Sequence, residues 1–367
     1  MGFNCGIVGL PNVGKSTLFN ALTSTAAAEA ANFPFCTIEP NTGRVGVPDK
    51  RLDKLAAIAG SAKIIPTQLE FVDIAGLVRG ASKGEGLGNQ FLGNIREVDA
   101  IIHVLRCFED DNITHVDDSI DPIRDAETVE TELMLSDLDS LEKREVTLTK
   151  KARGNDKDAA ATLLIVARCL KALQAGEPAR VVERRDEDEE RQFQMLQLIT
   201  AKPVLYVCNV EEDSASEGNS ISAKVFEKAA AEGAAAVVIS AQIEEEVSKL
   251  DSEEDKADFL ESLGLEETGL ARVIAEGYKL LNLLTFFTIG PKEARAWTVR
   301  DGGKAPNAAG VIHTDFERGF IKAETIACDD FIEFDGEAGA KEAGKMRQEG
   351  KEYITKDGDV FHFRFNV

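Results

Sequence analysis

The sequence predicts an α/β domain that is interrupted by a helical insertion and followed by a small α+β domain. Three observations lead to this prediction. An apolar run of strand length, a glycine-rich loop and an amphipathic helical pattern follow one another in residues 3–23. Two long helical patterns fill residues 125–176, and beyond residue 284 short β-type runs alternate with Gly, Pro and Asp turns. Because 367 residues exceed one ordinary core, we expect a first domain of residues 1–122 and 201–282, an insertion of 123–200 and a C-terminal domain of 283–367.

The first element is a strand that leads into a phosphate-binding loop. Residues 9–17, GLPNVGKST, match G-x-x-x-x-G-K-[ST] without a mismatch, between the apolar run FNCGIVG and the helical pattern TLFNALT. Gly9 and Gly14 allow backbone N–H groups to close around phosphate oxygens at the start of a helix. We expect Lys15 to reach the β- and γ-phosphates of a nucleotide and the Ser16 hydroxyl to bind Mg²⁺.

The next elements carry two further candidates for sensing the γ-phosphate. Thr37 lies in the loop NFPFCTIEPNTG, about twenty residues past Ser16, where a threonine hydroxyl can complete Mg²⁺ coordination. The run TQLEFVDIAG predicts a strand that ends at Asp73 of a D-x-x-G motif. We expect Asp73 to hold Mg²⁺ through water and the Gly76 amide to meet the γ-phosphate. The glycine-dense residues that follow, up to Gly93, are typical of a switch segment.

Three later strands complete this domain and present the base-reading position. DAIIHVLRCF, PVLYVCN and AAVVIS read as strands, and the second ends in Asn209-Val210-Glu211-Glu212, where GTPases of this class have N-K-x-D. Glu212 is one methylene longer than Asp and cannot keep the same bidentate geometry on guanine. Asn209 can serve the N6/N7 edge of adenine, so we predict an adenine site.

Two neighbouring segments complete the interpretation of the base site. A backbone amide of Ser240-Ala241, after the last strand, is expected to face a purine edge. Residues 248–251, Ser-Lys-Leu-Asp, fit a loose [NST]-K-x-D pattern. They lie inside a charged helical pattern with no strand before them, so we do not assign them to the base.

The insertion predicts an antiparallel helical arm. Two helical patterns, residues 125–152 and 156–176, are separated by a break at Gly154-Asn155. The apolar stripe is expected to pack the two helices together, and the charged run 184–192 to start a solvated helix. Residues 150–157, KKARGNDK, form the one clearly basic spot, which is a candidate for contact with rRNA.

The remainder of the chain is helical from about residue 242 to 282 and then changes character. TFFTIG, ARAWTV, GFIKAETI, DFIEFD and DVFHFRFNV read as short β-type runs, with one helix near AGAKEAGKMRQ. These runs predict the separate C-terminal α+β domain.

Composition excludes several functional classes. A formal charge of −23 argues against binding nucleic acid through bulk charge, and we expect no DNA partner. No apolar run has the length of a membrane span and we see no signal peptide, so we expect no membrane partner. The six cysteines are scattered without metal-ligand spacing, which favours a reducing, cytoplasmic location.

Taken with the C-terminal runs VIHTDFERGFIKAE and DGDVFHFRFNV, these motifs resemble the YchF family, the Obg-like ATPases, over essentially the whole chain. The resemblance implies a P-loop NTPase fold: a Ras-like core with an Obg-type switch, a coiled-coil insertion and a ubiquitin-like TGS domain. It also implies ATP preferred over GTP, slow hydrolysis to ADP, and association with ribosomes. Transferred by motif, the phosphate-binding residues are Asn12, Val13, Gly14, Lys15, Ser16 and Thr17. The Mg²⁺ ligands are Ser16 and Thr37, and Val210 contacts adenine.

Hydrolysis lacks its usual water-orienting residue. A glutamine follows D-x-x-G in Ras-type enzymes, whereas this chain has Leu77. His115, in the polar loop EDDNITHVDD, is a candidate base or water-orienter; the alternative is an exposed loop histidine without a catalytic role. His103, in the middle of a strand, is expected to be a core histidine.

Three functional hypotheses follow. The first is a Mg²⁺-dependent ATPase switch acting on the translation machinery. The second is an ATP-gated scaffold or stress regulator that acts through protein partners at the TGS domain or the helical arm, with incidental turnover. The third is an ordinary GTPase, which rests on the phosphate loop alone.

Overall fold

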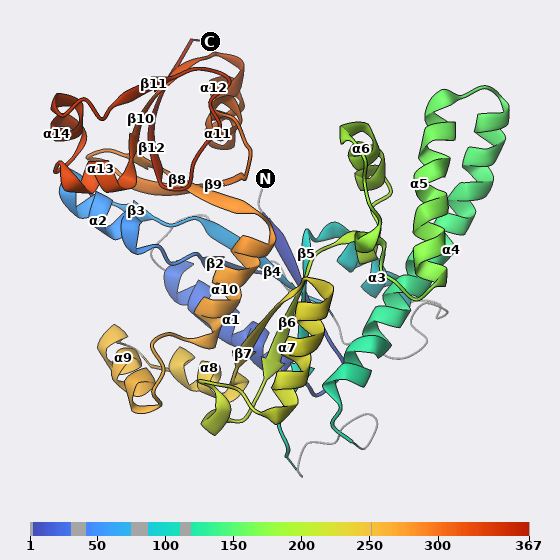
Figure 1. The fold of residues 1–367 in the computed structure, drawn as a ribbon. Helices are drawn as coiled ribbons and strands as arrows, with labels where there is room; N and C mark the ends of the chain where they lie inside the picture. The colour runs from blue at the N-terminus through green and yellow to red at the C-terminus, as the bar shows by residue number, and fades with distance from the viewer. Residues whose placement is uncertain (1–2, 31–41, 75–86, 111–118, 251, 367) are drawn as a thin grey trace. The chain divides into compact units, whose positions relative to one another are not determined.

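The computed structural model describes residues 3–30, 42–74, 87–110, 119–250 and 252–366 (Figure 1). The chain divides into two compact units. The larger unit contains residues 4–43 and 70–277, and the smaller unit contains residues 1–3, 44–69 and 278–367. Each unit is described by itself below.

A six-stranded sheet forms the centre of the larger unit, in the order β2-β4-β1-β5-β6-β7. Neighbours from β4 to β7 pair in parallel, so that the carboxyl ends of these strands meet at one edge. Strand β5 is buried along its whole length, as expected for a parallel sheet covered on both faces. The strands are β1 (Asn4–Val8), β2 (Thr42–Gly46), β4 (Gln68–Asp73), β5 (Ala100–Arg106), β6 (Val204–Asn209) and β7 (Ala235–Ile239).

Helices of this unit follow the strands along the chain. They are α1 (Lys15–Ala30), α3 (Leu87–Glu97), α7 (Ser220–Glu232), α8 (Ala241–Ser248), α9 (Glu253–Ser262) and α10 (Gly269–Leu280). The buried carboxylate of Glu244 accepts hydrogen bonds from the N–H groups of Gly269 and Leu270, at 2.7 and 3.2 Å. It thereby caps α10, whose first N–H groups have no partner within the helix.

The insertion forms the antiparallel helical arm that the sequence predicts (Figure 1). Its helices are α4 (Pro122–Arg153) and α5 (Lys157–Gln174), followed by α6 (Glu187–Met195). Asp121 caps α4 with Pro122 in its first turn, and Asp156 caps α5. The apolar stripes of both helices meet in one buried cluster that includes Leu141, Ile165 and Cys169, together with Phe193 of α6. The charged run at 184–192 starts α6, as predicted.

Two polar contacts fix the base of this arm. Asp137 of α4 is fully buried and accepts hydrogen bonds from the N–H groups of Ile199 and Thr200, at 3.0 and 2.8 Å. The Tyr206 hydroxyl of β6 lies within hydrogen-bond distance of Glu130 of α4 and Glu232 of α7, and its one proton can be donated to either carboxylate. Because buried polar groups need partners, these bonds fix α4, at the start of the arm, to the segment that leads from the arm back into β6.

The smaller unit is built on a second six-stranded sheet, in the order β11-β10-β12-β8-β9-β3. A cluster that includes Phe287 and Val360 lies between the sheet and α2 (Lys50–Ala59), and a second cluster around Phe286 includes residues of α11 (Ala305–Ile312). The strands are β3 (Ile64–Ile65), β8 (Leu283–Ile289), β9 (Ala294–Arg300), β10 (Phe320–Ala327), β11 (Arg347–Glu349) and β12 (Asp359–Phe365).

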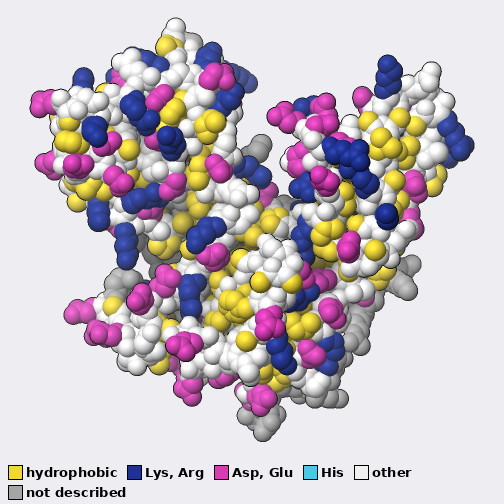
Figure 2. Space-filling view, in the orientation of Figure 1, with side chains coloured by type: hydrophobic (Ala, Val, Ile, Leu, Met, Phe, Trp, Pro, Cys, Tyr) yellow, Lys and Arg dark blue, Asp and Glu magenta, His cyan; other side chains and the backbone are white. Residues whose placement is uncertain are grey.

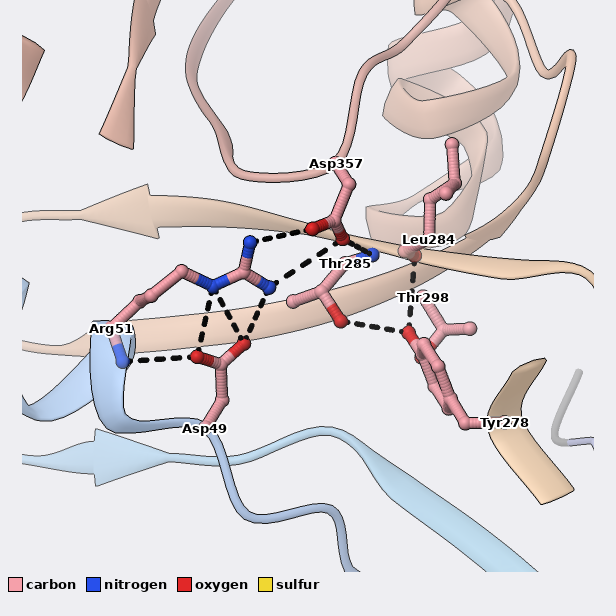
Figure 3. Close-up of polar contacts among 7 residues, drawn as sticks. All are labelled: Asp49, Arg51, Tyr278, Leu284, Thr285, Thr298 and Asp357. Atoms are coloured by element: carbon pink, nitrogen blue, oxygen red, sulfur yellow. Dashed lines mark hydrogen bonds and ion pairs between the residues drawn. The ribbon is translucent and has the colours of Figure 1, made fainter. Parts of the chain in front are cut away.

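Residues 44–69 lie in a different unit from the one expected, because the sequence analysis assigned them to the first domain. In the structure they belong to the smaller unit, because Leu52, Leu55 and Ala56 of α2 pack into its core. Arg51 adds polar contacts shown in Figure 3: it bonds Asp49 and, at 2.5 Å, Asp357. Asp357 in turn accepts from the Thr285 N–H at 2.9 Å.

One of the predicted strands of the C-terminal region is wrong. Residues of the run DFIEFD belong to a helix, α13 (Cys328–Glu333), whose buried residues Cys328 and Phe331 are three positions apart. Asp329 and Asp330 occupy its first turn, where acidic side chains favour a helix. The helix expected near residue 338 is α14 (Glu337–Glu342), whereas α11 and α12 (Thr314–Arg318) were not predicted. Among the described residues, no helix combines the length and apolarity needed to cross a membrane.

Candidate nucleotide site

The phosphate-binding loop connects β1 to α1 at the carboxyl edge of the parallel sheet. Gly9, Asn12 and Gly14 have φ values of 154°, 62° and 97°. Such values suit glycine, and asparagine tolerates the left-handed region better than most residues. A Cβ atom on Gly9 would lie 2.5 Å from the carbonyl oxygen of Val104. Residues 9–14 therefore adopt the tight turn that the glycine spacing predicted, with the amino end of α1 following directly.

Lys15 is held against this loop. Its side chain is 7% exposed, and Nζ donates to the carbonyl oxygens of Gly9 and Leu10 at 3.0 and 2.9 Å. Burial lowers the pKa of Lys15, while the nearby Asp73 carboxylate acts in the opposite direction. Ser16 is exposed, and Thr17 lines the cavity described below.

Asp73 ends β4 at the same sheet edge, in register with Ile7 of β1. Its Oδ1 atom is buried and has no hydrogen-bond partner among the described residues. Burial raises the pKa of this carboxyl group, and the Lys15 ammonium opposes the rise. A buried, unpaired carboxylate oxygen beside a phosphate-binding loop fits the water-mediated contact to Mg²⁺ expected of Asp73.

Asn209 has a different position from the one predicted. The sequence pattern placed its amide on the adenine edge, but the side chain is 4% exposed and both of its ends are bound within the protein. Nδ2 donates to the Val13 carbonyl at 3.0 Å, and Oδ1 accepts from the Ala241 N–H at 2.9 Å. Asn209 therefore joins the phosphate-binding loop to the start of α8. A Cβ atom on Gly14 would lie 2.3 Å from Nδ2 of Asn209, so the contact between Asn209 and the loop requires glycine at position 14.

The Ala241 amide is likewise not free for a purine, because it donates to Asn209. Ser240 is buried and is the residue before α8. Val210 is 3% exposed and its N–H donates to the Ile239 carbonyl at 2.8 Å. These residues line the cavity wall, and they hold the ends of β6 and β7 together.

A cavity of about 890 Å³ opens between the phosphate-binding loop and the segments that follow β5, β6 and β7. Asn12, Gly14 and Thr17 line its loop end. Glu212 lines it from the base-reading segment, and its Oε1 atom is buried without a partner among the described residues. The cavity thus brings the loop and the N-V-E-E segment, which are almost 200 residues apart in sequence, to one site.

Several lining residues were not predicted from the sequence. Phe108, Glu109 and Asp110 follow β5, and Gln242, Glu245, Glu246 and Lys249 come from α8 and its end. No motif marks the residues after β5; only their position behind a buried strand could have indicated them. Lys249 belongs to the Ser-Lys-Leu-Asp segment that was set aside, and it pairs with Glu245 at 2.7 Å.

Charge is distributed unevenly over the cavity. Seven acidic side chains line it away from the phosphate-binding loop, with Lys249 as the basic side chain among the lining residues. At this end, burial acts to raise the pKa of Glu211, but hydrogen bonds from Ser214 and Asn219 outweigh it and lower the pKa. Acidic groups repel phosphate, whereas the loop and Lys15 attract it, so the geometry favours a nucleotide with its phosphates at the loop and its base at the acidic end. The acidic lining residues are Glu109, Asp110, Glu211, Glu212, Asp213, Glu245 and Glu246.

Four predicted site residues, Thr37, Gly76, Leu77 and His115, lie outside the described residues. The core assignment of His103 is confirmed: it is 2% exposed, and burial lowers its pKa to about 3. The described cysteines, among them Cys5, Cys107 and Cys208, are all buried.

Comparison with known proteins agrees with this geometry. Residues 4–137 match a family described as "50S ribosome-binding GTPase", and residues 283–366 match the YchF-GTPase_C family, described as "Protein of unknown function (DUF933)". The structure superposes on the YchF GTPase of Schizosaccharomyces pombe with a TM-score of 0.89 and 37% identity, covering 99% of this chain and 98% of the other.

Curated relatives match from end to end. The chain is 60% identical to the "Ribosome-binding ATPase YchF" of Haemophilus ducreyi, 58% to that of Escherichia coli O157:H7 and 55% to that of Bacillus subtilis. Each match covers 100% of both sequences. With identity at this level over the full length, and with the P-loop domain and C-terminal domain both matched, the chain belongs to the YchF family.

Proposed function

We propose that this chain is an ATPase that acts as a ribosome-binding switch in the cytoplasm. One observation carries the catalytic part: a single cavity connects a complete phosphate-binding loop to the N-V-E-E segment. The ribosomal part is supported by the printed names of relatives that are 55–60% identical over their full length.

Adenine is the base we expect at the acidic end. The unpaired Glu212 oxygen requires a donor, and the exocyclic amine of adenine supplies one. Guanine offers donors as well, so the preference for adenine rests on Val210 and Glu212, which stand where GTPases of this class have Lys and Asp. A GTPase is the second candidate, because the matched N-terminal family and the S. pombe structure are both described as GTPases. Calorimetry with ATP and GTP in the presence of Mg²⁺ separates the two. Tighter binding of GTP than of ATP would overturn the proposal.

Mg²⁺ fits the donor set at the loop. The exposed Ser16 hydroxyl and the unpaired Asp73 oxygen are hard oxygen donors of the kind that Mg²⁺ prefers, and Thr37 is the third candidate from the sequence. The ion would neutralise charge on the β- and γ-phosphates. Within the protein, Lys15 positions the same phosphates, and the backbone N–H groups of the loop bind them.

Lys15→Ala tests the site directly. Loss of a charge-assisted contact of about 1.5–3 kcal/mol predicts an ATP affinity about 10- to 150-fold lower. The matched control is Lys54→Ala, an exposed lysine of the smaller unit, which should bind ATP as the unaltered chain does. Equal affinity for ATP in both variants would show that nucleotide does not bind at this loop.

We expect intrinsic hydrolysis to be slow, because Leu77 cannot orient water through a hydrogen bond. Single-turnover hydrolysis by His115→Ala, with ATP affinity unchanged, tests the sequence-based role of His115. An unaltered rate would remove His115 from the mechanism.

Measurements with purified ribosomes distinguish an ATPase switch from an ATP-gated scaffold. Co-sedimentation with purified ribosomes in the presence of ATP or ADP measures nucleotide-dependent binding, and turnover is measured with and without ribosomes. Strong stimulation supports the ATPase switch. Unchanged turnover with partner binding that still depends on ATP supports the scaffold.

A further inference from the structure

The outer part of the helical arm is basic, although the chain is strongly acidic. Residues 143–167 contain six Lys and Arg but only three Asp and Glu, in a chain with a formal charge of −23. Figure 2 shows Lys and Arg side chains at the free end of the α4–α5 hairpin, whereas acidic and basic side chains lie together around α6. A local concentration of positive charge of this kind calls for a specific explanation.

Four of these cations form a cluster at the turn between the helices, which we call the arm tip: Lys150, Lys151, Arg153 and Lys157. All four are exposed, and none pairs with an acidic residue in the described part of the chain. Cations lower on the arm do have partners, such as Lys143 with Asp139 at 2.6 Å and Arg168 with Glu189 at 2.7 Å.

Two nearby acids offset half of this charge. Asp156 is the N-cap of α5, where its carboxylate accepts from the Ala159 N–H at 3.0 Å, and Asp158 is exposed. Four Lys and Arg against two Asp leave residues 150–158 with a formal charge of +2. The tip is thus a solvent-facing set of donors, in contrast to the internal ion pairs closer to the base of the arm.

Helix electrostatics explain only part of the cluster. Lys150, Lys151 and Arg153 occupy the last turn of α4, where cations interact favourably with the helix dipole. Lys157, however, is the first residue of α5, where the dipole disfavours a cation. The four side chains also repel one another. Helix stability therefore does not explain why cations gather both at the carboxyl end of α4 and at the amino end of α5.

The length of the arm isolates the tip from the acidic body. Ser136, which accepts a hydrogen bond from Arg96 of α3 at 3.1 Å, marks the base of the arm. From Ser136 to Arg153 the helix rises about 26 Å, at about 1.5 Å per residue. This distance is about three Debye lengths at physiological salt, so the acidic body barely weakens the attraction of the tip for an anion.

We propose that the arm tip binds the phosphate backbone of helical RNA. Arg153 offers a planar fork suited to phosphate, and the three lysines offer mobile point charges. Residues 146–164 contain no aromatic side chain on which an unpaired base could stack, which favours a duplex backbone over single-stranded bases. The inference rests on the proposed ribosomal function to identify the RNA as ribosomal. The chemistry of phosphate binding by the arm tip does not depend on that function.

The test compares three variants with the unaltered full-length chain. The first reverses charge at the tip: Lys150→Glu, Lys151→Glu and Arg153→Glu. The second replaces the same residues by Gln, which avoids placing acids at the carboxyl end of α4. The third is a matched control, Lys54→Glu, Lys171→Glu and Lys224→Glu, which changes the net charge equally at exposed sites away from the tip. The readouts are co-sedimentation with purified ribosomes, anisotropy of a labelled RNA hairpin between about 50 and 200 mM salt, and ATP affinity.

We expect both tip variants to lose at least ten-fold in affinity for ribosomes and for the hairpin, with ATP affinity unchanged. Because each lost phosphate contact reduces the slope of log affinity against log salt by about one, the slope should fall by about three. The control should stay close to the unaltered chain.

Three results would overturn the inference or separate it from the proposed function. Tip variants that bind ribosomes and hairpin as well as the control does would exclude the tip. Loss of ribosome binding with an unchanged hairpin affinity and salt slope would assign the tip to a protein partner instead of RNA. If the unaltered chain binds the hairpin through the tip but no ribosome in any nucleotide state, the ribosomal function fails while the inference stands.

Discussion

Asn209→Ala distinguishes the role of Asn209 seen in the structure from the role that its sequence position suggests. In the structure the amide joins two backbone groups, the Val13 carbonyl and the Ala241 N–H. Alanine removes both hydrogen bonds and leaves both backbone groups in a nearly dry site, since Asn209 is 4% exposed.

The magnitude follows from these contacts. Each hydrogen bond contributes about 0.5–1.5 kcal/mol net, and each buried group left unpaired costs about 1–3 kcal/mol if water cannot reach it. Partial hydration from the adjoining cavity reduces the second cost. We therefore expect the free energy of unfolding of the larger unit to fall by about 2–4 kcal/mol. A loosened phosphate-binding loop should then bind any nucleoside triphosphate about 10- to 100-fold more weakly, which corresponds to about 1.4–2.8 kcal/mol.

Two measurements on the same preparation provide the assay: denaturant unfolding, and calorimetric titration with ATP and with GTP. If Asn209 holds the loop, the affinities for ATP and GTP fall by the same factor, because the lost contacts do not involve the base. The control is Asn307→Ala in the smaller unit, where the amide oxygen accepts one N–H bond from Lys304 at 3.0 Å. This change should leave nucleotide affinity unaltered.

The opposite pattern would refute this reasoning. If Asn209→Ala weakens ATP binding selectively and leaves the free energy of unfolding unchanged, Asn209 reads adenine, as its sequence position suggests.

The remaining predictions concern the base end of the cavity, a buried carboxyl group and the smaller unit. Phe108→Ala removes an aromatic wall and should weaken ATP binding by about 1–3 kcal/mol if the ring stacks on the base, and calorimetry that shows no change would place the base elsewhere. Burial raises the pKa of Glu244 to about 6 from an ordinary 4.5, so its contribution to stability is present below pH 4.5 and is lost as pH rises through 6. Relative to the unaltered chain, Glu244→Gln should therefore gain about 2 kcal/mol in free energy of unfolding between pH 4.5 and 7, and a pH-independent difference in denaturant titrations would contradict this shift. Leu55→Ala should destabilise the smaller unit by about 2–5 kcal/mol with ATP affinity intact, whereas a loss no larger than that of Ile321→Ala, an exposed site of the same unit, would show that α2 is not part of that core.

Much of this architecture could be predicted because it depends on local patterns. The phosphate-binding loop, the strand ending at Asp73 and the helical arm each combine a periodic apolar pattern with a specific terminator, such as Gly154 or the glycines of the loop. Periodicity and turn chemistry act over a few residues, so the sequence alone shows them.

The errors arise where distant contacts decide the outcome. The amphipathic pattern of residues 50–59 predicts a helix, but nothing local indicates which sheet it covers; Phe287 and Val360, far along the chain, settle that. The partner of Asn209 is likewise 196 positions away. In DFIEFD, aromatic and β-branched residues favour a strand, yet packing of Cys328 and Phe331 on one side overrides this local preference.

The cavity itself could not be read from the sequence. Phe108 and Lys249 enter it because parallel strands deliver their following segments to one edge, a property of the sheet as a whole. The sequence identified the phosphate end, where a motif exists, and missed the side chains that form the far wall.

The position of α2 in the smaller unit has a consequence for biosynthesis. Arg51 and Asp357, which are in contact, are 306 positions apart. At a translation rate of about 5–20 residues per second, residues 44–69 emerge from the ribosome about 15–60 s before the strands that cover them. During that interval Leu52, Leu55 and Ala56 have no native partner, and the smaller unit must complete its folding after most of the larger unit has been made. The core of the smaller unit can therefore form only once its C-terminal strands have been made, and residues 44–69 remain without these native contacts until then.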